Sequence, residues 1–250
     1  MTRTVSVRGL VDEALRLARR RWGNRDGWWP GDDGLEIAIG AVLVQNAAWR
    51  NAERALDALR AAALFDLDRL RRTSIRDLER LIRPAGTYRR KARTILALAE
   101  WFAARGGASI EARLGGAVRE VRASLLGVPG IGPETAAAIM LYAGGHPVFV
   151  ADAFAKRILV RHGLIDASAA PGDVAAWFEA ATPPDSKLLA ELHAHVVSTG
   201  QGHCRPRVAR CDDCPFSAWP LPVSPFPDSD PASGRAGDAR RSSPGSSSPP

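Results

Sequence analysis

A turn rich in glycine is the first place in this sequence where residue types and spacing could do chemistry. It runs from Gly127 through Gly130 and Gly132 to Pro133, between two apolar helical segments. Proline is typical of the first position of a helix, and glycine lets the backbone adopt positive φ and approach a ligand closely. The N–H groups at such a helix start can bind a phosphate. A connection without a ligand stays open as the alternative, because short glycine motifs recur by chance.

A carboxylate follows this turn after twenty residues. Asp152 comes after the apolar run Val148–Val150 and stands at the start of a helix of small residues. A helix amino terminus favours the charged form of a carboxylate. The same place also suits an aspartate that only caps the helix, so a catalytic and a structural role are both open.

Three cysteines lie close together near the carboxyl end, all within Cys204–Cys214. The amino terminus lacks the charged-then-apolar pattern of a signal peptide, which predicts a cytoplasmic protein with reduced thiols. Three crowded thiols in such a protein indicate a metal or cluster site rather than a disulfide framework.

The elements that must position these residues are predicted to be helices, about ten of them and no strand. The expected ranges are Val5–Trp22, Leu35–Gln45, a segment ending near Ala63, a short helix opened by Ser74, a long helix ending near Ala104, Ala117–Leu126, Pro133–Ala143, Ala153–Arg161, Pro171–Ala180 and Asp185–Ser198. The predicted fold class is therefore all-α.

The composition of the chain indicates which kind of partner the protein binds. The chain has 250 residues, 46% of them hydrophobic, and a net charge of +7 that comes almost wholly from arginine. This charge fits a polyanion partner, although an arginine-rich composition can also reflect genomic bias. No apolar run approaches the length of a membrane span. From about Leu221 onward the residues are mostly Pro, Ser, Gly, Asp and Arg, and this predicts a disordered tail.

Several motifs in register resemble the helix-hairpin-helix DNA glycosylase superfamily, in its endonuclease III-like branch. The hairpin pattern matches at Leu126, Gly130, Ile131, Gly132, Thr135 and Ala136, and Asp152 follows at the family's spacing. Trp28-Trp29-Pro30, Gly40–Trp49 and Val150–Arg157 resemble the 3-methyladenine glycosylase subgroup of that branch. The resemblance covers roughly residues 28–214, which is most of the predicted folded chain.

The resemblance implies an endonuclease III-like fold of two helical subdomains. Residues 27–142 would form a six-helix barrel that includes the hairpin at 117–143. Residues 1–26 and 143–221 would form the second subdomain, with a Cys loop at 204–220, and residues 222–250 the tail. The DNA cleft and Asp152 would lie between the two subdomains.

The implied activity is base excision from damaged duplex DNA by a monofunctional glycosylase, with alkylated purines as the expected substrates. Asp152 would stabilise the positive charge that develops on the sugar, or orient the attacking water. Bifunctional relatives carry a Schiff-base lysine where this chain has Glu134. An endonuclease III-type lyase acting on oxidised pyrimidines, with Lys156 as the amine, and a non-catalytic DNA-binding module are the alternatives.

The resemblance also assigns residues to DNA contact. Gly130, Ile131, Gly132 and Thr135 would bind the phosphate backbone, and Lys156 would touch a phosphate or pair with Asp152. Gln45 would fill the space left by the flipped base, with capping of nearby carbonyls as its alternative. Tyr88 would act as a second wedge beside Thr87. Trp28, Trp29 and Trp49 would stack on a cationic base, with a role in the core as the alternative. The expected partner is double-stranded DNA, bound by a monomer at the nucleoid.

The cysteines match the first three ligands of the family's iron–sulfur loop, whose fourth ligand falls on Pro220. A 4Fe-4S cluster normally uses four protein ligands. The sequence leaves open a three-ligand cluster, one completed by His203, a zinc site of three cysteines and a histidine, and a loop ordered by packing alone.

Overall fold

The computed structural model describes residues 6–31 and 33–220, and this part of the chain contains helices and loops but no strand. The all-α fold predicted from the sequence is confirmed. The helices are α1 (Val7–Trp22), α2 (Gly34–Leu43), α3 (Trp49–Ala61), α4 (Leu67–Arg72), α5 (Ile75–Leu81), the 3-10 turn η1 (Arg83–Ala85), α6 (Tyr88–Ala104), α7 (Ile110–Arg113), α8 (Val118–Leu126), α9 (Pro133–Ala138), the π-helical turn η2 (Ile139–Ala143), α10 (Ala153–Arg161), α11 (Pro171–Ala181) and α12 (Ser186–Gly202).

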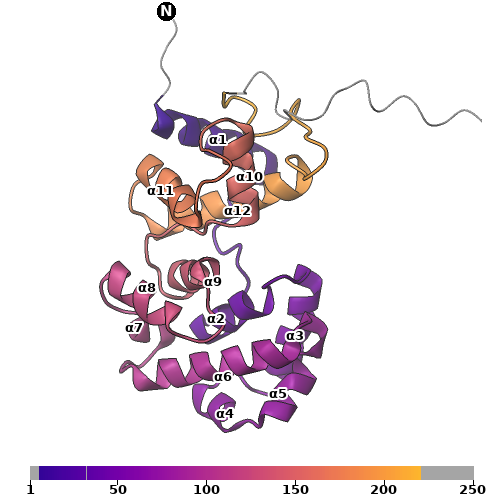
Figure 1. The fold of residues 1–250 in the computed structure, drawn as a ribbon, viewed down its shortest axis with the longest axis vertical. Coiled ribbons are helices and arrows are strands. Elements are labelled where there is room, and N and C mark those ends of the chain that lie inside the picture. Colours follow the sequence, from indigo (N-terminus) through magenta and orange to yellow (C-terminus); the bar gives the residue numbers. More distant parts are fainter. Residues whose placement is uncertain (1–5, 32, 221–250) are drawn as a thin grey trace, which may run out of the picture.

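The helices gather in two groups. Figure 1 shows α1, α10, α11 and α12 at one end of the molecule, α3 to α6 at the other, and α2 and α9 between them. The chain passes between the groups along two connections: one follows α1 and contains Trp28 and Trp29, and the other precedes α10 and ends at Asp152. Candidate residues from distant parts of the sequence therefore lie on the two connections. The subdomain boundaries at 27–142 and 143–221 stay a prediction.

Helix α2 is buried as its composition predicts. Every residue of Gly34–Leu43 is buried except Ile37, which is half-buried. Asp33 caps its start by accepting a hydrogen bond from the Glu36 N–H at 2.8 Å. The helix packs against α3, α6, α9 and η2, and its one charged residue, Glu36, forms an ion pair with Arg60 of α3. It leads directly to Gln45.

The second arm of the hairpin differs from its prediction. Pro133–Ala143 was expected to be a single helix, but α9 ends at Ala138 and the π-helical turn η2 follows. The Gly144 N–H donates to the Ile139 carbonyl at 3.1 Å, which spans five residues instead of four. The chain then runs extended through Val148–Val150, which pair with no strand, to Asp152.

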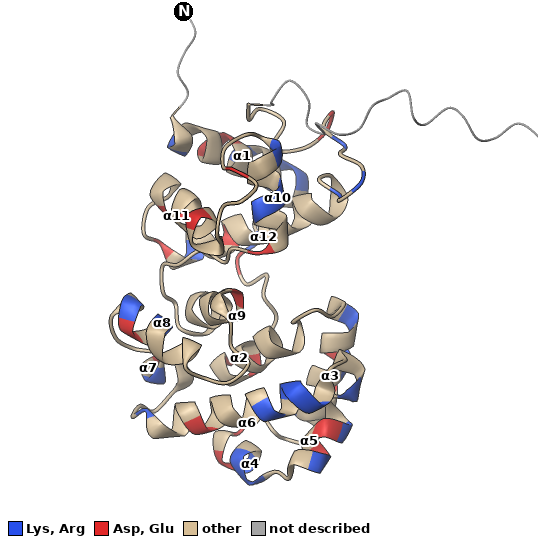
Figure 2. Cartoon of the chain, viewed as in Figure 1, with Lys and Arg blue, Asp and Glu red and all other residues tan. Residues whose placement is uncertain are grey.

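Basic residues occur on most of the described helices. Figure 2 shows Lys and Arg on α3, on the amino-terminal half of α6 and on α10, and also on α4 and near α7 and α8. None of the described helices is long and apolar enough to cross a membrane. The predicted tail, residues 222–250, lies outside the described residues.

Candidate active site

Asp152 caps α10 and also faces a buried histidine. Its Oδ1 accepts a hydrogen bond from the Ala155 N–H at 2.7 Å, so the structural role left open by the sequence is realised. Its Oδ2 lies 3.6 Å from His193 Nε2. The side chain of Asp152 is only 10% exposed. One oxygen is thus fixed by the helix while the other points toward α12.

His193 and Tyr142 complete this site, and the sequence motifs gave no sign of either. The Tyr142 hydroxyl lies 2.6 Å from His193 Nδ1, while His193 Nε2 is buried without a hydrogen-bond partner. Burial and the neighbouring Asp152 charge raise the pKa of Tyr142 well above its usual value, so the phenol keeps its proton. The one hint in the sequence is a histidine within a largely apolar helix.

The three predicted pocket tryptophans form one aromatic cluster beside this site. Trp29 contacts Trp28 and Trp49 edge-on, with centroid distances of 6.2 and 5.8 Å, and stacks on Tyr142 at 4.7 Å. Trp28 reaches His193 at 6.0 Å. All three tryptophans are half-buried, so they line a surface that reaches Asp152 through Tyr142 and His193.

Glu134 belongs to the same electrostatic site. It lies in the first turn of α9 and is accessible to solvent. Loss of hydration raises the pKa of its carboxyl group, and the Asp152 charge raises it further. A carboxyl group therefore stands near Asp152 where bifunctional relatives would place an amine.

The hairpin glycines have different tasks. Gly130 has φ +89°, and a Cβ there would overlap the Oγ1 of Thr94 on α6. Gly132 has open space around it. Ile131 and Thr135, both predicted to touch DNA, are buried. Any contact of these two residues with DNA therefore uses the backbone.

Gln45 binds the hairpin in this structure. Its Nε2 donates to the Gly130 carbonyl at 3.1 Å and to Thr135 Oγ1 at 2.8 Å, in line with the alternative that it satisfies nearby carbonyls. Tyr88 is half-buried at the start of α6. The residue before it, Thr87, is exposed and has φ +36°, a left-handed conformation that is strained for a β-branched residue.

Lys156 is held away from Asp152. Its Nζ donates to the Ala169 carbonyl at 2.7 Å, so the ammonium is tied to the loop before α11. The expected pairing of Lys156 with Asp152 is not formed. Lys156 Nζ is therefore bound to a backbone carbonyl, and position 134 carries a carboxyl group in place of an amine.

A second lysine, Lys91, joins the end of α2 to the turn η1 before α6. Its buried Nζ donates to the Leu43 carbonyl at 2.7 Å and to the Ala85 carbonyl at 2.8 Å. Leu43 precedes Gln45, and Ala85 precedes Thr87. One ammonium therefore fixes both segments that carry the proposed wedge residues.

The Cys loop does not fit an iron–sulfur cluster. Cys204, Cys211 and Cys214 border a cavity of about 20 Å³, room for roughly one water molecule. No group of three His, Cys, Asp or Glu side chains in the described residues could hold a metal ion. Pro220 stands at the fourth position, and its carbonyl accepts from His162 Nδ1 at 2.9 Å.

Protein contacts tie the Cys loop to α10 instead. Arg161 donates to the Cys204 Sγ at 3.2 Å and to the carbonyls of Arg205 and Pro206 at 2.6 and 2.7 Å. Burial raises the pKa of Cys214 to about 11, and neighbouring thiols add to the shift.

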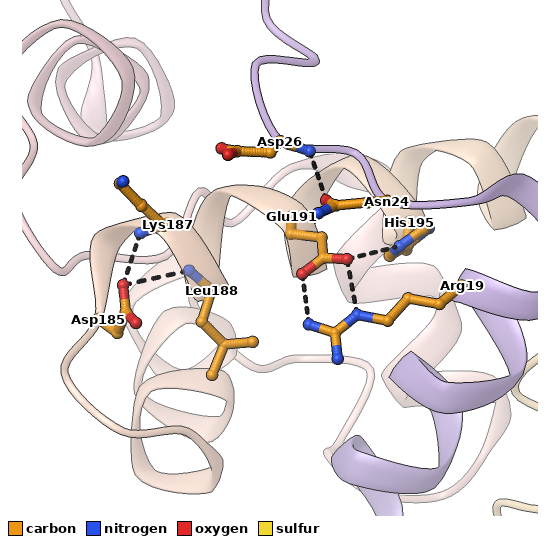
Figure 3. A network of polar contacts seen from close by, with 8 residues as sticks. All are labelled: Arg19, Asn24, Asp26, Asp185, Lys187, Leu188, Glu191 and His195. Atoms are coloured by element: carbon orange, nitrogen blue, oxygen red, sulfur yellow. Dashed lines mark hydrogen bonds and ion pairs between the residues drawn. The ribbon is translucent and has the colours of Figure 1, made fainter.

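Polar contacts fix α12, which carries His193, against α1 (Figure 3). Arg19 donates from Nε to Glu191 Oε1 at 2.7 Å and from Nη2 to Glu191 Oε2 at 2.5 Å. His195 Nε2 lies 3.5 Å from the same Glu191 Oε1. This geometry is bidentate, and the Glu191 side chain is 7% exposed, so the pair is a specific link between the two ends of the chain.

Comparison with known proteins identifies the family. The family model of the HhH-GPD superfamily of base excision DNA repair proteins matches residues 39–184. The chain belongs to this superfamily. The resemblance found in the sequence is therefore confirmed. A presumed DNA repair glycosylase of Methanocaldococcus jannaschii is 35% identical over 78% of this chain and 88% of its own length.

Other HhH-GPD members share the fold more distantly. Endonuclease III of Bacillus subtilis is 26% identical over 54% of this chain and 57% of its own length. Two solved structures cover most of the chain. Helicobacter pylori 3-methyladenine DNA glycosylase bound to 1,N6-ethenoadenine has a TM-score of 0.67 and 23% identity, over 78% of this chain and 97% of that one. A trapped endonuclease III–DNA covalent intermediate has a TM-score of 0.66 and 21% identity, over 84% of this chain and 93% of that one. At these identities the structures show the shared fold.

Proposed function

We propose that this HhH-GPD protein is a monofunctional DNA glycosylase that hydrolyses the N-glycosidic bond of alkylated purines in duplex DNA. The observation that carries the proposal is Asp152 beside a cluster of aromatic side chains, with Glu134 in place of a nucleophilic amine. Breaking the glycosidic bond develops positive charge on the sugar, and the Asp152 carboxylate stabilises that charge while water attacks. Without an amine at the site, no covalent imine forms.

The aromatic cluster supports an alkylated purine as the substrate. Such a base carries a positive charge, and π faces attract cations more strongly than neutral rings. Trp29 is the centre of the cluster, since it contacts Trp28, Trp49 and Tyr142. Trp49 is held by a hydrogen bond from its Nε1 to Glu53 Oε1 at 2.6 Å.

The hairpin and the basic helices supply the proposed DNA contacts. Backbone N–H groups at Gly130–Thr135 face a phosphate, and Gln45 and Tyr88 enter the duplex where the base leaves. In that step Gln45 breaks its two hydrogen bonds to the hairpin. The alternative role of Gln45 is to hold Gly130 and Thr135 together without entering the DNA. Lys156 contributes charge near the backbone, and the protein acts as a monomer.

We also propose that the Cys loop folds without a cluster. Its three thiols surround a cavity that holds about one water molecule, and Arg161 supplies three hydrogen bonds where a cluster would otherwise tie the loop together. No step of the reaction involves this loop.

The test is a panel of duplexes that each carry one defined lesion: a methylated adenine, a methylated guanine, an oxidised pyrimidine or a T·G mismatch. The wild-type protein should release methylated purines and leave a strand that breaks only in alkali, and borohydride should trap no adduct. Asp152→Asn should slow base release by about 100-fold or more while DNA affinity is kept or raised, because one negative charge is removed. Asp173→Asn, on α11, is the control.

Three outcomes would contradict this proposal. Base release by Asp152→Asn at the wild-type rate would remove Asp152 from the reaction. Borohydride trapping would show a lyase, and Lys156 would be the first amine to test. DNA binding without release of any base would favour a non-catalytic module.

A further inference from the structure

We propose that His193 is a positioning residue for Asp152, and that Tyr142 sets the tautomer in which it acts. This inference rests on the proposed glycosylase function and adds residues that the sequence motifs do not contain. His193 Nε2 is one of several buried side-chain nitrogens that have no hydrogen-bond partner, and it lies 3.6 Å from Asp152 Oδ2. Buried polar atoms in folded proteins almost always have a partner, so this orphan needs an explanation.

Tyr142 decides where the imidazole proton lies. Its hydroxyl is 2.6 Å from His193 Nδ1 and 3.3 Å from the Ala190 carbonyl, so the histidine is the closer partner. A phenol has one proton to donate, and we assign it to this shorter contact, so that Tyr142 donates to Nδ1. The neutral imidazole then carries its own proton on Nε2, which faces Asp152.

The two oxygens of Asp152 therefore have separate tasks. Oδ1 is fixed by the Ala155 N–H at 2.7 Å, and Oδ2 receives the Nε2–H of His193 after a shift of about 0.5 Å, since N–H···O bonds have N···O distances near 3 Å. With both oxygens held, the carboxylate cannot rotate away from the sugar. A neutral donor leaves the negative charge of Asp152 in place, whereas a lysine or arginine at this position would neutralise it.

The surroundings of His193 favour this arrangement. Phe149 and Trp28 contact the imidazole edge-on at 5.9 and 6.0 Å. The His193 side chain is 4% exposed, so water competes little for Nε2. Glu134 on α9 is a further carboxyl group near the pair, and loss of hydration and the Asp152 charge raise its pKa.

Two amide variants test the proposal, because each keeps one nitrogen position of the imidazole. His193→Gln places an amide N–H near the position of Nε2, and His193→Asn places its amide near Nδ1 and does not reach Asp152. His193→Asn should lower the single-turnover rate of base release about 10- to 100-fold, as expected when a charged acceptor loses a hydrogen bond. His193→Gln should keep most of the rate. The Kd for the lesion duplex and the melting temperature should be alike in both variants.

A second measurement does not depend on activity. Nitrogen-15 NMR of the histidines should show His193 protonated on Nε2 in the wild-type protein, and Tyr142→Phe should change this tautomer ratio. The proposal falls if His193 carries its proton on Nδ1, if both amide variants keep the wild-type rate, or if both lose rate and melting temperature equally. Failure of the wild-type protein to release any base would refute the proposed function, and the tautomer result would still decide the geometry.

Discussion

Lys91 is a lysine whose side chain is buried in the folded protein. Its ammonium donates hydrogen bonds to the backbone carbonyl of Leu43 at the end of α2 and to that of Ala85 in η1. Burial, and then the nearby Arg90 charge, lower the pKa of Lys91 to about 8. At neutral pH the folded protein therefore keeps a buried charge at the base of the loops that carry Gln45 and Thr87.

This environment predicts a rise in stability at alkaline pH. The unfolded chain holds the Lys91 proton up to about pH 10.4, but the folded chain releases it near pH 8. The contribution of Lys91 to the free energy of unfolding should then increase between pH 8 and pH 10, by at most about 3 kcal/mol. Lys91→Met should lack this increase in urea denaturation, whereas Lys187→Met, an exposed control, should keep it. Parallel pH curves for Lys91→Met and the wild type would contradict the assignment.

The sequence predicted some residues of the site and missed others for a physical reason. Asp152 and Glu134 stand at fixed spacings within a local motif, so they could be found by counting. Tyr142 and His193 meet because η2 packs against α12, and this contact joins residues 51 positions apart. No local spacing encodes such a contact.

Among the elements, the hairpin separates a glycine needed for folding from a glycine available to a ligand. Gly130→Ala should destabilise the protein by about 1–3 kcal/mol through its left-handed backbone, and more through overlap with Thr94. Gly132→Val should leave the melting temperature unchanged, because the space beside Gly132 is open. If the hairpin binds phosphate, Gly132→Val should weaken binding to all duplexes alike, by about tenfold. Unchanged affinity and salt dependence would make the hairpin purely structural.

A second structural element, the Cys loop, also gives a testable prediction. Protein purified without oxygen should be colourless and contain neither iron, sulfide nor zinc in stoichiometric amounts, and a chelator should not lower its melting temperature. Arg161→Met should lower that temperature, because Arg161 holds three acceptors of the loop. Brown protein that bleaches in Cys211→Ala would show that a cluster assembles after all.

Most helices were predictable, and the exceptions are instructive. The long amphipathic and apolar helices match their predicted ranges within a few residues, since periodicity and caps mark them. The predicted cap of α5 is present, where the Asp77 N–H donates to Ser74 Oγ at 3.1 Å. Helices α4 and α7 were missed because six and four residues are too few to show a period.

At the scale of the whole molecule, buried histidines should make the protein sensitive to acid. Burial lowers the pKa of His162, His195 and His203, although Glu191 and Asp213 partly offset the shift at His195 and His203. Below about pH 6.5 these histidines bind protons in the unfolded chain, whereas in the folded chain they stay neutral to lower pH. The free energy of unfolding should therefore fall as the pH drops from 6.5 toward 5.

His195→Gln provides the check, since His195 lies between Trp22 and Glu191, where α1 and α12 meet. In chemical denaturation this variant should lose less stability than the wild type between pH 6.5 and pH 5. An equal loss of stability in both proteins would show that the acid sensitivity comes from groups other than His195.

The π-helical turn Ile139–Ala143 has a consequence for how homologous sequences are aligned. A π turn holds about one residue more than an α-helical turn, so the side chains of Ile139–Ala143 are rotated about the helix axis relative to those of a regular helix. A homologue with a regular helix there would have one residue fewer, and an alignment anchored on both motifs would place its gap arbitrarily. The residue in the column of Tyr142 would then point to another side of the helix. Homologues of this protein should be matched by the direction of that side chain, and the motif spacing alone will mislead.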